Sequence, residues 1–77
     1  MNNAHRKCLL EKVLPLISEA RCHLEELASE ENEALDNLPE GLRESERGER
    51  MGEIASALDE TVSALEDVES TLEECTE

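Results

Sequence analysis

The sequence predicts an all-α protein built as an antiparallel helical hairpin, and three observations lead to this fold class. Apolar residues recur at the 3-4 spacing of a helix face through two separate stretches, 10–34 and 51–75. A segment that contains Pro39 and Gly41 separates them. No strand-like alternation of apolar and polar residues occurs. We therefore expect residues 1–77 to form a single helical domain.

The first helix is expected to cover about residues 3–36, with Asn2 or Asn3 as its N-cap. Pro15 falls inside this stretch, removes a backbone donor and collides with the preceding turn, so the helix either kinks or breaks there. The apolar pattern keeps its phase across Pro15, which favours a kink. The expected inward face consists of Leu10, Val13, Ile17, Ala20, Leu24, Leu27 and Ala34, with Glu31 interrupting it.

Residues 37–45 are expected to connect the two helices. Asn37 suits a left-handed C-cap, Pro39 cannot continue a helix, and Gly41 permits a turn. Ser45 is the expected N-cap of a second helix that covers about residues 46–75.

The second helix carries a seven-residue repeat, formed by Met51, Ile54, Leu58, Thr61, Leu65, Val68, Leu72 and Cys75. This period predicts coiled-coil-like packing against another helix. A short connection makes the helices antiparallel, and matching the ends of the two stretches sets Leu24 near Thr61. The residues expected to pack the helices, or to hold an oligomer, are Leu10, Val13, Ile17, Leu24, Leu27, Ile54, Leu58, Leu65, Val68 and Leu72.

The chain is too small to build a large core, because 77 residues bury only about 60% of the unfolded surface. It has no aromatic residue, so the core must come from aliphatic side chains. Further apolar residues flank the expected seam: Leu9, Leu14, Leu16, Ala28, Ala55, Ala57, Val62 and Ala64. This wider face predicts completion by self-association, as a homo-oligomer, or by a partner protein.

Charge is distributed unevenly along the chain, whose formal net charge is −14. Residues 1–23 carry four basic and two acidic groups, whereas residues 24–77 carry 19 acidic and three basic groups. An acidic surface repels nucleic acid and anionic membranes and attracts basic protein surfaces. The expected partner is a protein with a basic surface, such as a nucleic-acid-binding host factor. No stretch is apolar enough to span a membrane, and the lack of an export signal favours the cytoplasm.

The acidic residues of the second helix form the candidate binding site. Residues 51–77 hold nine acidic side chains and no Lys or Arg, and acidic pairs recur every seven residues, about 10 Å apart along a helix. The candidate partner-binding residues are Asp59, Glu60, Glu66, Asp67, Glu69, Glu73 and Glu74. One interpretation is mimicry of a phosphate backbone, and the other is a solvated face that only confers solubility.

Catalysis, metals and cofactors find little support in the sequence. No nucleophile–base or phosphate-loop pattern occurs, so we expect a protein that is not an enzyme and needs no cofactor. His5 and Cys8 share a helix face that Cys75 could approach, but no zinc-type spacing completes a site. A Cys8–Cys75 disulfide and simple apolar packing of Cys75 stay open as alternatives.

The stretch SEENEALDNLPEGL at residues 29–42, followed by SERGE at 45–49 and the acidic Leu/Ala helix, resembles short acidic proteins encoded in bacteriophages and prophages, mostly of Gram-positive bacteria. The resemblance covers about residues 25–75. It implies a helical hairpin and a mobile genetic element. It implies no chemistry, so no site residue carries over from it.

Three functions follow as hypotheses. The first is a phage-type inhibitor or regulator that occupies a basic surface of a host protein, such as a nuclease or a CRISPR effector. The alternative is a homo-oligomeric structural or adaptor module in which the acidic residues serve solubility. The third is a regulatory or antitoxin-like subunit that covers one cognate protein through its apolar flank.

Overall fold

The computed structural model describes residues 1–77 and is all-helical, with 87% of its residues in helices and no strand. The prediction of an all-α protein is confirmed. The elements are α1 (Asn3–Cys8), the π-helical segment η1 (Leu9–Val13), α2 (Leu14–Asp36), α3 (Glu40–Arg43) and α4 (Glu46–Glu74). None of these helices combines the length and the apolar composition that a membrane span requires.

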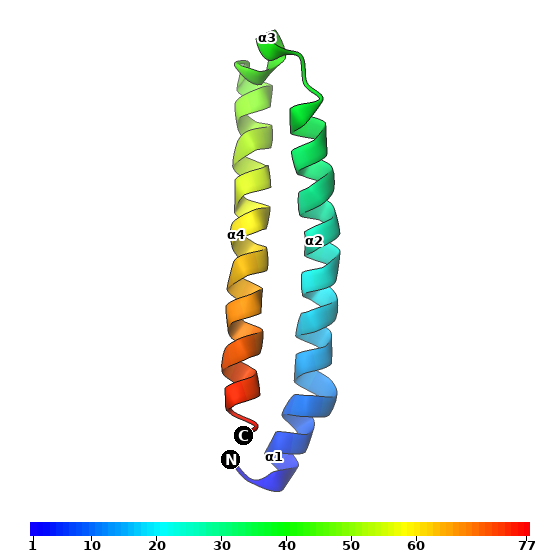
Figure 1. Cartoon of the computed structure of the whole chain (residues 1–77), viewed down its shortest axis with the longest axis vertical. Helices are drawn as coiled ribbons and strands as arrows, with labels where there is room; N and C mark the ends of the chain where they lie inside the picture. Colours follow the sequence, from blue (N-terminus) through cyan, green and yellow to red (C-terminus); the bar gives the residue numbers. More distant parts are fainter.

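The two long helices, α2 and α4, lie side by side and run in opposite directions, so that both chain ends are at the same end of the molecule (Figure 1). Their Cα atoms form a rod of 57 × 15 × 14 Å. The short α3 lies at the other end, where the chain reverses (Figure 1). One layer of two helices leaves most side chains in contact with solvent, and only four residues are buried.

The helical backbone continues through Pro15 and widens just before it. The Leu14 N–H donates to the Leu9 carbonyl, five residues back, so residues 9–13 form a π-helical turn. Proline lacks an N–H, and its ring would collide with the carbonyl of Glu11 in a regular α-helix. The wider turn makes room for the ring without ending the helix. Figure 1 shows α1 inclined to the axis of α2 at this point.

The connection between α2 and α4 satisfies the backbone groups that a helix end leaves open. The Arg43 guanidinium donates to the Asp36 carbonyl at 2.7 Å, and the Asn37 N–H donates to the Glu33 carbonyl at 3.1 Å. Asn37 is the C-cap residue of α2, but its φ of −85° is right-handed. The expected left-handed cap was therefore wrong, because these bonds close the helix without a positive φ. Gly41 also has an ordinary φ, since it lies inside α3.

Helix α4 begins at a capped and closely packed turn. Ser45 is its N-cap residue and accepts a hydrogen bond from the Gly48 N–H at 3.2 Å, as the sequence predicts. Gly48 is buried because the end of α3 lies against it. A Cβ atom at this position would collide with the carbonyl oxygens of Leu42 and Arg43. Gly48 thus permits a close approach of two backbones rather than an unusual φ.

Alanine at the two glycines of α4 should change stability in opposite directions. At Gly52 no atom lies within 4 Å of a new Cβ, so Gly52→Ala should gain about 1 kcal/mol of helix propensity and raise Tm by roughly 5 °C. At Gly48 the collision with backbone atoms should instead cost about 1–3 kcal/mol and lower Tm. Thermal unfolding followed by circular dichroism measures both. An equal rise in Tm for the two variants would contradict the close contact at Gly48.

The contact between α2 and α4 follows a 3-4 row on each helix, which we call the seam. Ala28 and Ala55 are its buried centre, with exposed fractions of 5% and 2%. The buried and half-buried residues of the row are Leu14, Ile17, Arg21, Leu24, Ala28, Glu31 and Leu35 on α2 and Gly48, Met51, Ala55, Leu58, Val62, Leu65, Glu69 and Leu72 on α4. Small residues at the centre let the two helices approach closely.

The seam is rotated from the one the repeat led us to expect. Met51, Leu58, Leu65 and Leu72 belong to it as expected, but Ala55 and Val62 replace Ile54 and Thr61 as their companions. The register differs as well. Arg21 contacts Glu69 and Asn32 contacts Asp59, which places Leu24 about one and a half helical turns beyond its expected neighbour Thr61. The seam continues past Ala34 to Leu35, so the ends of the apolar stretches do not mark the register of the two helices.

Candidate functional site

Six carboxylates on α4 form one continuous exposed surface, which we call the acidic face: Asp59, Glu60, Glu66, Asp67, Glu73 and Glu74. They occupy three adjacent pairs at seven-residue intervals, so each pair lies about 10 Å from the next on the same side of the helix. All six are exposed. The seven-residue period of the sequence therefore places negative charge at regular intervals along one side of α4.

Most of this charge has no basic partner within the chain. Among the nine acidic residues of 51–77, only Glu53 and Glu69 form ion pairs, with Arg50 and Arg21. The other seven, which include the whole acidic face, face solvent or a neutral group. Asp59 has such a neutral neighbour, because the Asn32 amide lies 3.3 Å from its carboxylate. The negative charge of the acidic face is thus not neutralised by basic residues of the same chain, and it creates a negative electrostatic potential at this surface.

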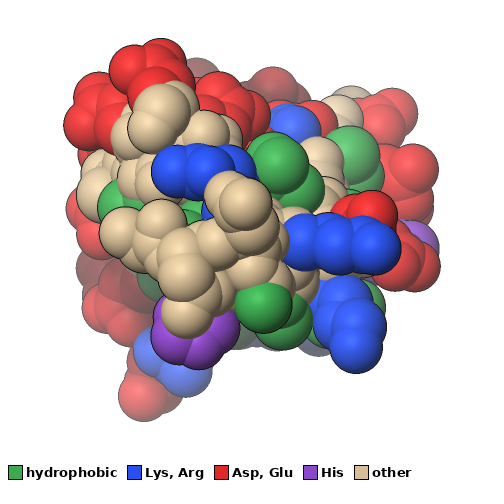
Figure 2. Space-filling view, turned by 90° about the horizontal axis from the view of Figure 1, so that it is seen from below, with side chains coloured by type: hydrophobic (Ala, Val, Ile, Leu, Met, Phe, Trp, Pro, Cys, Tyr) green, Lys and Arg blue, Asp and Glu red, His purple; other side chains and the backbone are tan.

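Basic side chains lie at both ends of the rod, with Arg6, Lys7 and Lys12 near the termini and Arg43, Arg47 and Arg50 near the chain reversal. Figure 2 looks along the rod from the end where the termini lie, and Lys and Arg side chains lie at the front of this view, with Asp and Glu around the rim. This end contains α1, whose sequence includes His5, Arg6 and Lys7. No ion pair joins α1 to the acidic residues at the end of α4. After Arg50, α4 therefore carries only negative charge, and the basic residues of the chain lie elsewhere.

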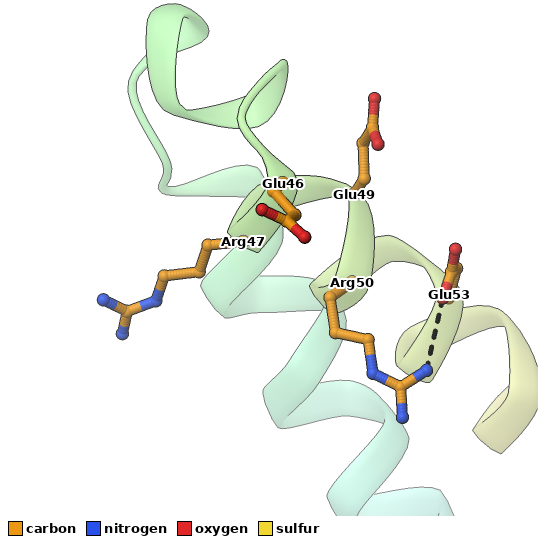
Figure 3. Close-up of a pocket in the computed structure, with 5 residues that line it drawn as sticks. All are labelled: Glu46, Arg47, Glu49, Arg50 and Glu53. Atoms are coloured by element: carbon orange, nitrogen blue, oxygen red, sulfur yellow. Dashed lines mark hydrogen bonds and ion pairs between the residues drawn. The ribbon is translucent and has the colours of Figure 1, made fainter.

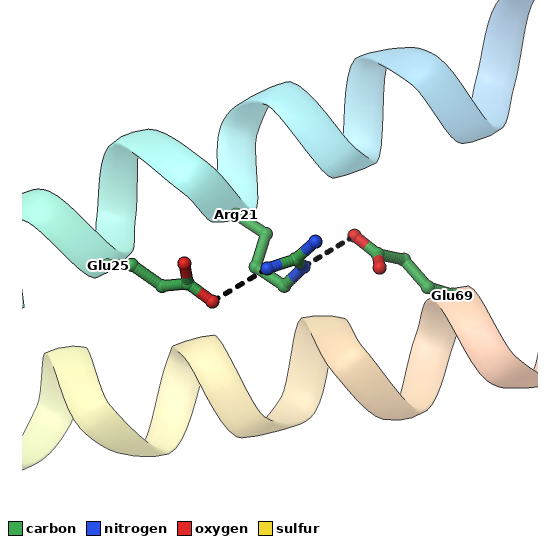
Figure 4. Close-up of polar contacts among 3 residues, drawn as sticks. All are labelled: Arg21, Glu25 and Glu69. Atoms are coloured by element: carbon green, nitrogen blue, oxygen red, sulfur yellow. Dashed lines mark hydrogen bonds and ion pairs between the residues drawn. The ribbon is translucent and has the colours of Figure 1, made fainter.

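Glu69 differs from the other sequence-predicted binding residues because it belongs to the seam. The Arg21 Nε donates to the Glu69 Oε1 at 2.8 Å, and the Arg21 Nη1 donates to the Glu25 Oε1 at 2.6 Å (Figure 4). The side chains of Arg21 and Glu69 are only 20% and 16% exposed. The hydrogen bonds to Glu69 and then to Glu25 raise the pKa of Arg21 above its already high ordinary value. Glu69 is thus occupied within the chain and is not free to bind a partner.

Removing Arg21 should destabilise the helix pair, and removing its partner as well should reverse most of the loss. In Arg21→Met the Glu69 carboxylate is left at the seam without a cation, so Tm should fall. In the double variant Arg21→Met, Glu69→Leu no charge remains there, and Tm should return close to the wild-type value or above it. Thermal unfolding of both variants at one protein concentration measures this. A double variant less stable than the single one would contradict an ion pair that acts as a unit.

The start of α4 carries a shallow depression lined by Glu46, Arg47, Glu49, Arg50 and Glu53 (Figure 3). The Arg50 Nη1 lies 3.2 Å from the Glu53 Oε2, whereas the Arg47 side chain points away from Glu53. No apolar side chain lines this depression, and it opens widely to solvent. Small-molecule sites are usually enclosed and largely apolar, so this one has the character of a mixed-charge surface.

The ten residues expected to pack helices or to hold an oligomer fall into two groups. Ile17, Leu24, Leu58, Leu65 and Leu72 are half-buried at the seam. Leu10, Val13, Leu27, Ile54 and Val68 are exposed, at 48%, 37%, 49%, 36% and 41%. The second group is consequently not used for packing within one chain.

Four of these five exposed residues, all except Leu10, lie on one side of the helix pair, which we call the apolar flank. It consists of Val13, Ala20, Leu27 and Ala34 along the first helix and Ile54, Thr61, Val68 and Cys75 along α4. All but Cys75 directly precede a seam residue, Cys75 continues the seven-residue spacing of Val68, and all eight are exposed. The contact between Asn32 and Asp59, each four residues after a seam residue, marks the opposite side of the pair. Positions on either side of a seven-residue seam face opposite ways, so both helices present the flank on a common side.

The three cysteines, Cys8, Cys22 and Cys75, are free and exposed. The Cys8–Cys75 disulfide, which the sequence left open, is not formed. Cys75 is not packed against apolar neighbours within the chain either, because it lies on the apolar flank.

The fold and its surfaces define a small all-helical protein with a segregated acidic face and an exposed apolar flank. No protein-family model matches the chain, and no curated protein or solved structure matches it either.

Proposed function

We propose that the chain is a non-enzymatic, phage-type inhibitor or regulator that binds a host protein in the bacterial cytoplasm through its acidic face. The partner is a protein with a basic surface. A nucleic-acid-binding host factor, such as a nuclease or a CRISPR effector, is the preferred class, because regularly spaced carboxylates on a rod can take the place of a phosphate backbone.

The observation that carries this proposal is the unpaired charge of the acidic face. A helix whose acidic residues serve only solubility gains stability by mixing Glu with Lys four residues away, and α4 does not do so after Arg50. Glu73 and Glu74 also lie at the C-terminal end of α4, where the helix dipole disfavours negative charge and no basic residue offsets it. Charge kept at a cost to stability favours a role in binding.

The proposal includes the architecture that holds the acidic face in place. In it, α2 and α4 form an antiparallel hairpin with coiled-coil-like packing along the seam, and self-association or a partner covers the remaining apolar surface. The 3-4 spacing of the seam residues and the contact of Arg21 with Glu69 support this packing. A rigid hairpin keeps the three carboxylate pairs at fixed separations, which reduces the entropy lost on binding.

The test is a pull-down from bacterial lysate with the tagged full-length chain, washed in steps of increasing salt. Mass spectrometry identifies the protein in each fraction, and a parallel sample is challenged with duplex DNA. Capture of a nucleic-acid-binding protein that leaves with salt or with DNA is the expected result. Retention of only a partner insensitive to both would contradict the proposal.

A second candidate function is a homo-oligomeric structural or adaptor module without mimicry. The observation that favours it is the apolar flank, which an isolated chain leaves in contact with water. In this case the acidic residues keep the assembly dispersed and contact no partner. Wild-type affinity for every captured protein after neutralisation of the acidic face would favour this module.

A further inference from the structure

We infer that the apolar flank is a docking surface for a second copy of the same chain, which makes a dimer with the acidic faces directed outward. The inference assigns a surface and a partner to the self-association proposed above, and it does not depend on binding through the acidic face. It rests on how the flank is composed, how large it is and how little core one chain contains.

The α4 side of the flank is uncharged from residue 51 to residue 75. From residue 51 to 75, every acidic residue except the seam residue Glu69 belongs to the acidic face or is Glu53. The exposed residues Ala57, Ala64 and Thr71 lie beside the flank and widen this uncharged strip. A strip without charge offers nothing that would select a basic or an acidic partner. It is, however, complementary to a copy of itself, as the interface of a two-fold dimer must be.

The area of the flank suits a dimer. Residues 13–34 cover roughly 30 Å of helix, and two adjacent helices give a width of about 20 Å, so each copy would bury about 600 Å². The total of about 1,200 Å² reaches the lower bound of specific, stable interfaces. The exposed Leu27, Ile54 and Val68 are spread along this length rather than confined to one end.

One chain has little core of its own. Leu9, Ala28 and Ala55 are its only buried apolar residues, and two of the three are alanines. Small scaffolds usually add a disulfide, a metal or a second subunit, and the three cysteines are free. Stacking two flanks adds a second apolar layer parallel to the seam. It also leaves the carboxylates on the outside, where repulsion between two chains of charge −14 is weakest.

Analytical ultracentrifugation of the full chain under reducing conditions, at low and at high salt, tests the inference. We expect a species of twice the 8.6 kDa chain mass, with a dissociation constant that falls as salt screens the repulsion. The variant Leu27→Gln, Val68→Gln should raise this constant at least tenfold and keep the helical signal in circular dichroism, because both side chains are exposed within one chain. The matched control is Ser29→Gln, Ser63→Gln, which changes two exposed positions away from the flank and should dimerise as the wild type does.

A monomeric wild type at both salt concentrations would overturn the inference, even if another protein were captured on the flank. A flank variant that dimerises with the wild-type constant would overturn it as well. The result is independent of the proposed function, because binding through the acidic face weakens with salt whereas the dimer strengthens. Neutralising the acidic face should leave the dimer intact.

Discussion

Reversing one carboxylate pair of the acidic face, in the variant Glu66→Lys, Asp67→Lys, should weaken binding to the captured host protein by about tenfold or more. Each exposed ion pair contributes roughly 0.2–1 kcal/mol, and reversal replaces an attraction by a repulsion at two positions in the middle of the acidic face. Every 1.4 kcal/mol changes the dissociation constant tenfold. Isothermal titration calorimetry at physiological salt measures the change.

The matched control is Glu30→Lys, Glu44→Lys, which alters the net charge equally at exposed positions outside the acidic face. It should lose much less affinity than the reversed pair. If both variants lose the same affinity, the net charge of the chain determines binding and the acidic face has no specific role. If the reversed pair binds as the wild type does, the acidic face is not the binding surface.

The second large effect is expected at the seam, where Leu65→Asn should lower the stability of the helix pair by roughly 2 kcal/mol. Leu65 is half-buried, so the substitution removes apolar contact and brings a polar amide to the interface. For a chain of this size the loss corresponds to a fall in Tm of roughly 10 °C.

The control for Leu65 is Ser70→Asn, because Ser and Asn have similar helix propensities and Ser70 is exposed on the same helix, away from the seam and the apolar flank. Its Tm should stay within a few degrees of the wild type, by thermal unfolding at matched concentration. A Leu65 variant with unchanged Tm would contradict a seam that holds the two helices together.

Much of the fold follows from local signals in the sequence. The 3-4 spacing predicts helices, and a serine followed by Glu46 and Glu49 in the first turn predicts the start of α4 at Ser45. These signals depend on residues that are close in sequence, so they predict the helices without knowledge of which helix packs against which. The π-helical turn before Pro15 is harder to foresee, since a proline can be accommodated by a kink, a break or a wider turn.

The rotation of the seam could not be predicted from periodicity. On α4 two rows share Met51, Leu58, Leu65 and Leu72, and both have 3-4 spacing. One adds Ile54 and Val68, which are larger and more apolar, and the other adds Ala55 and Glu69. The structure uses the second row, because Ala55 and Ala28 permit close approach and Arg21 neutralises Glu69. These contacts join residues far apart in sequence, so no local pattern reveals them.

A signal for the role of Glu69 was nevertheless present. Ala55, Val62 and Glu69 are seven residues apart, and Glu69 is the only acidic residue between 51 and 75 that belongs to this row. Arg21 likewise falls seven residues before Ala28 in the first helix. Two opposite charges at seam positions of neighbouring helices are expected to pair. The positions of Arg21 and Glu69 in these rows thus predict that Glu69 packs between the helices and does not belong to the acidic face.

The acidic face and the apolar flank lie on different sides of α4, which gives the two proposals different partners and opposite salt dependence. A dimer joined through the flank would present two acidic faces, each on its outer surface. Such an arrangement would let one dimer engage two copies of a basic partner and gain avidity where the geometry allows both contacts.

Competition between this chain and duplex DNA for the captured host protein shows directly whether the acidic face takes the place of a phosphate backbone. Fluorescence anisotropy of a labelled duplex bound to that protein is followed while the chain is added. Our account predicts full displacement of the duplex, at concentrations that rise with salt and rise further for Glu66→Lys, Asp67→Lys. A complex in which the host protein holds the duplex and the chain at once would contradict it.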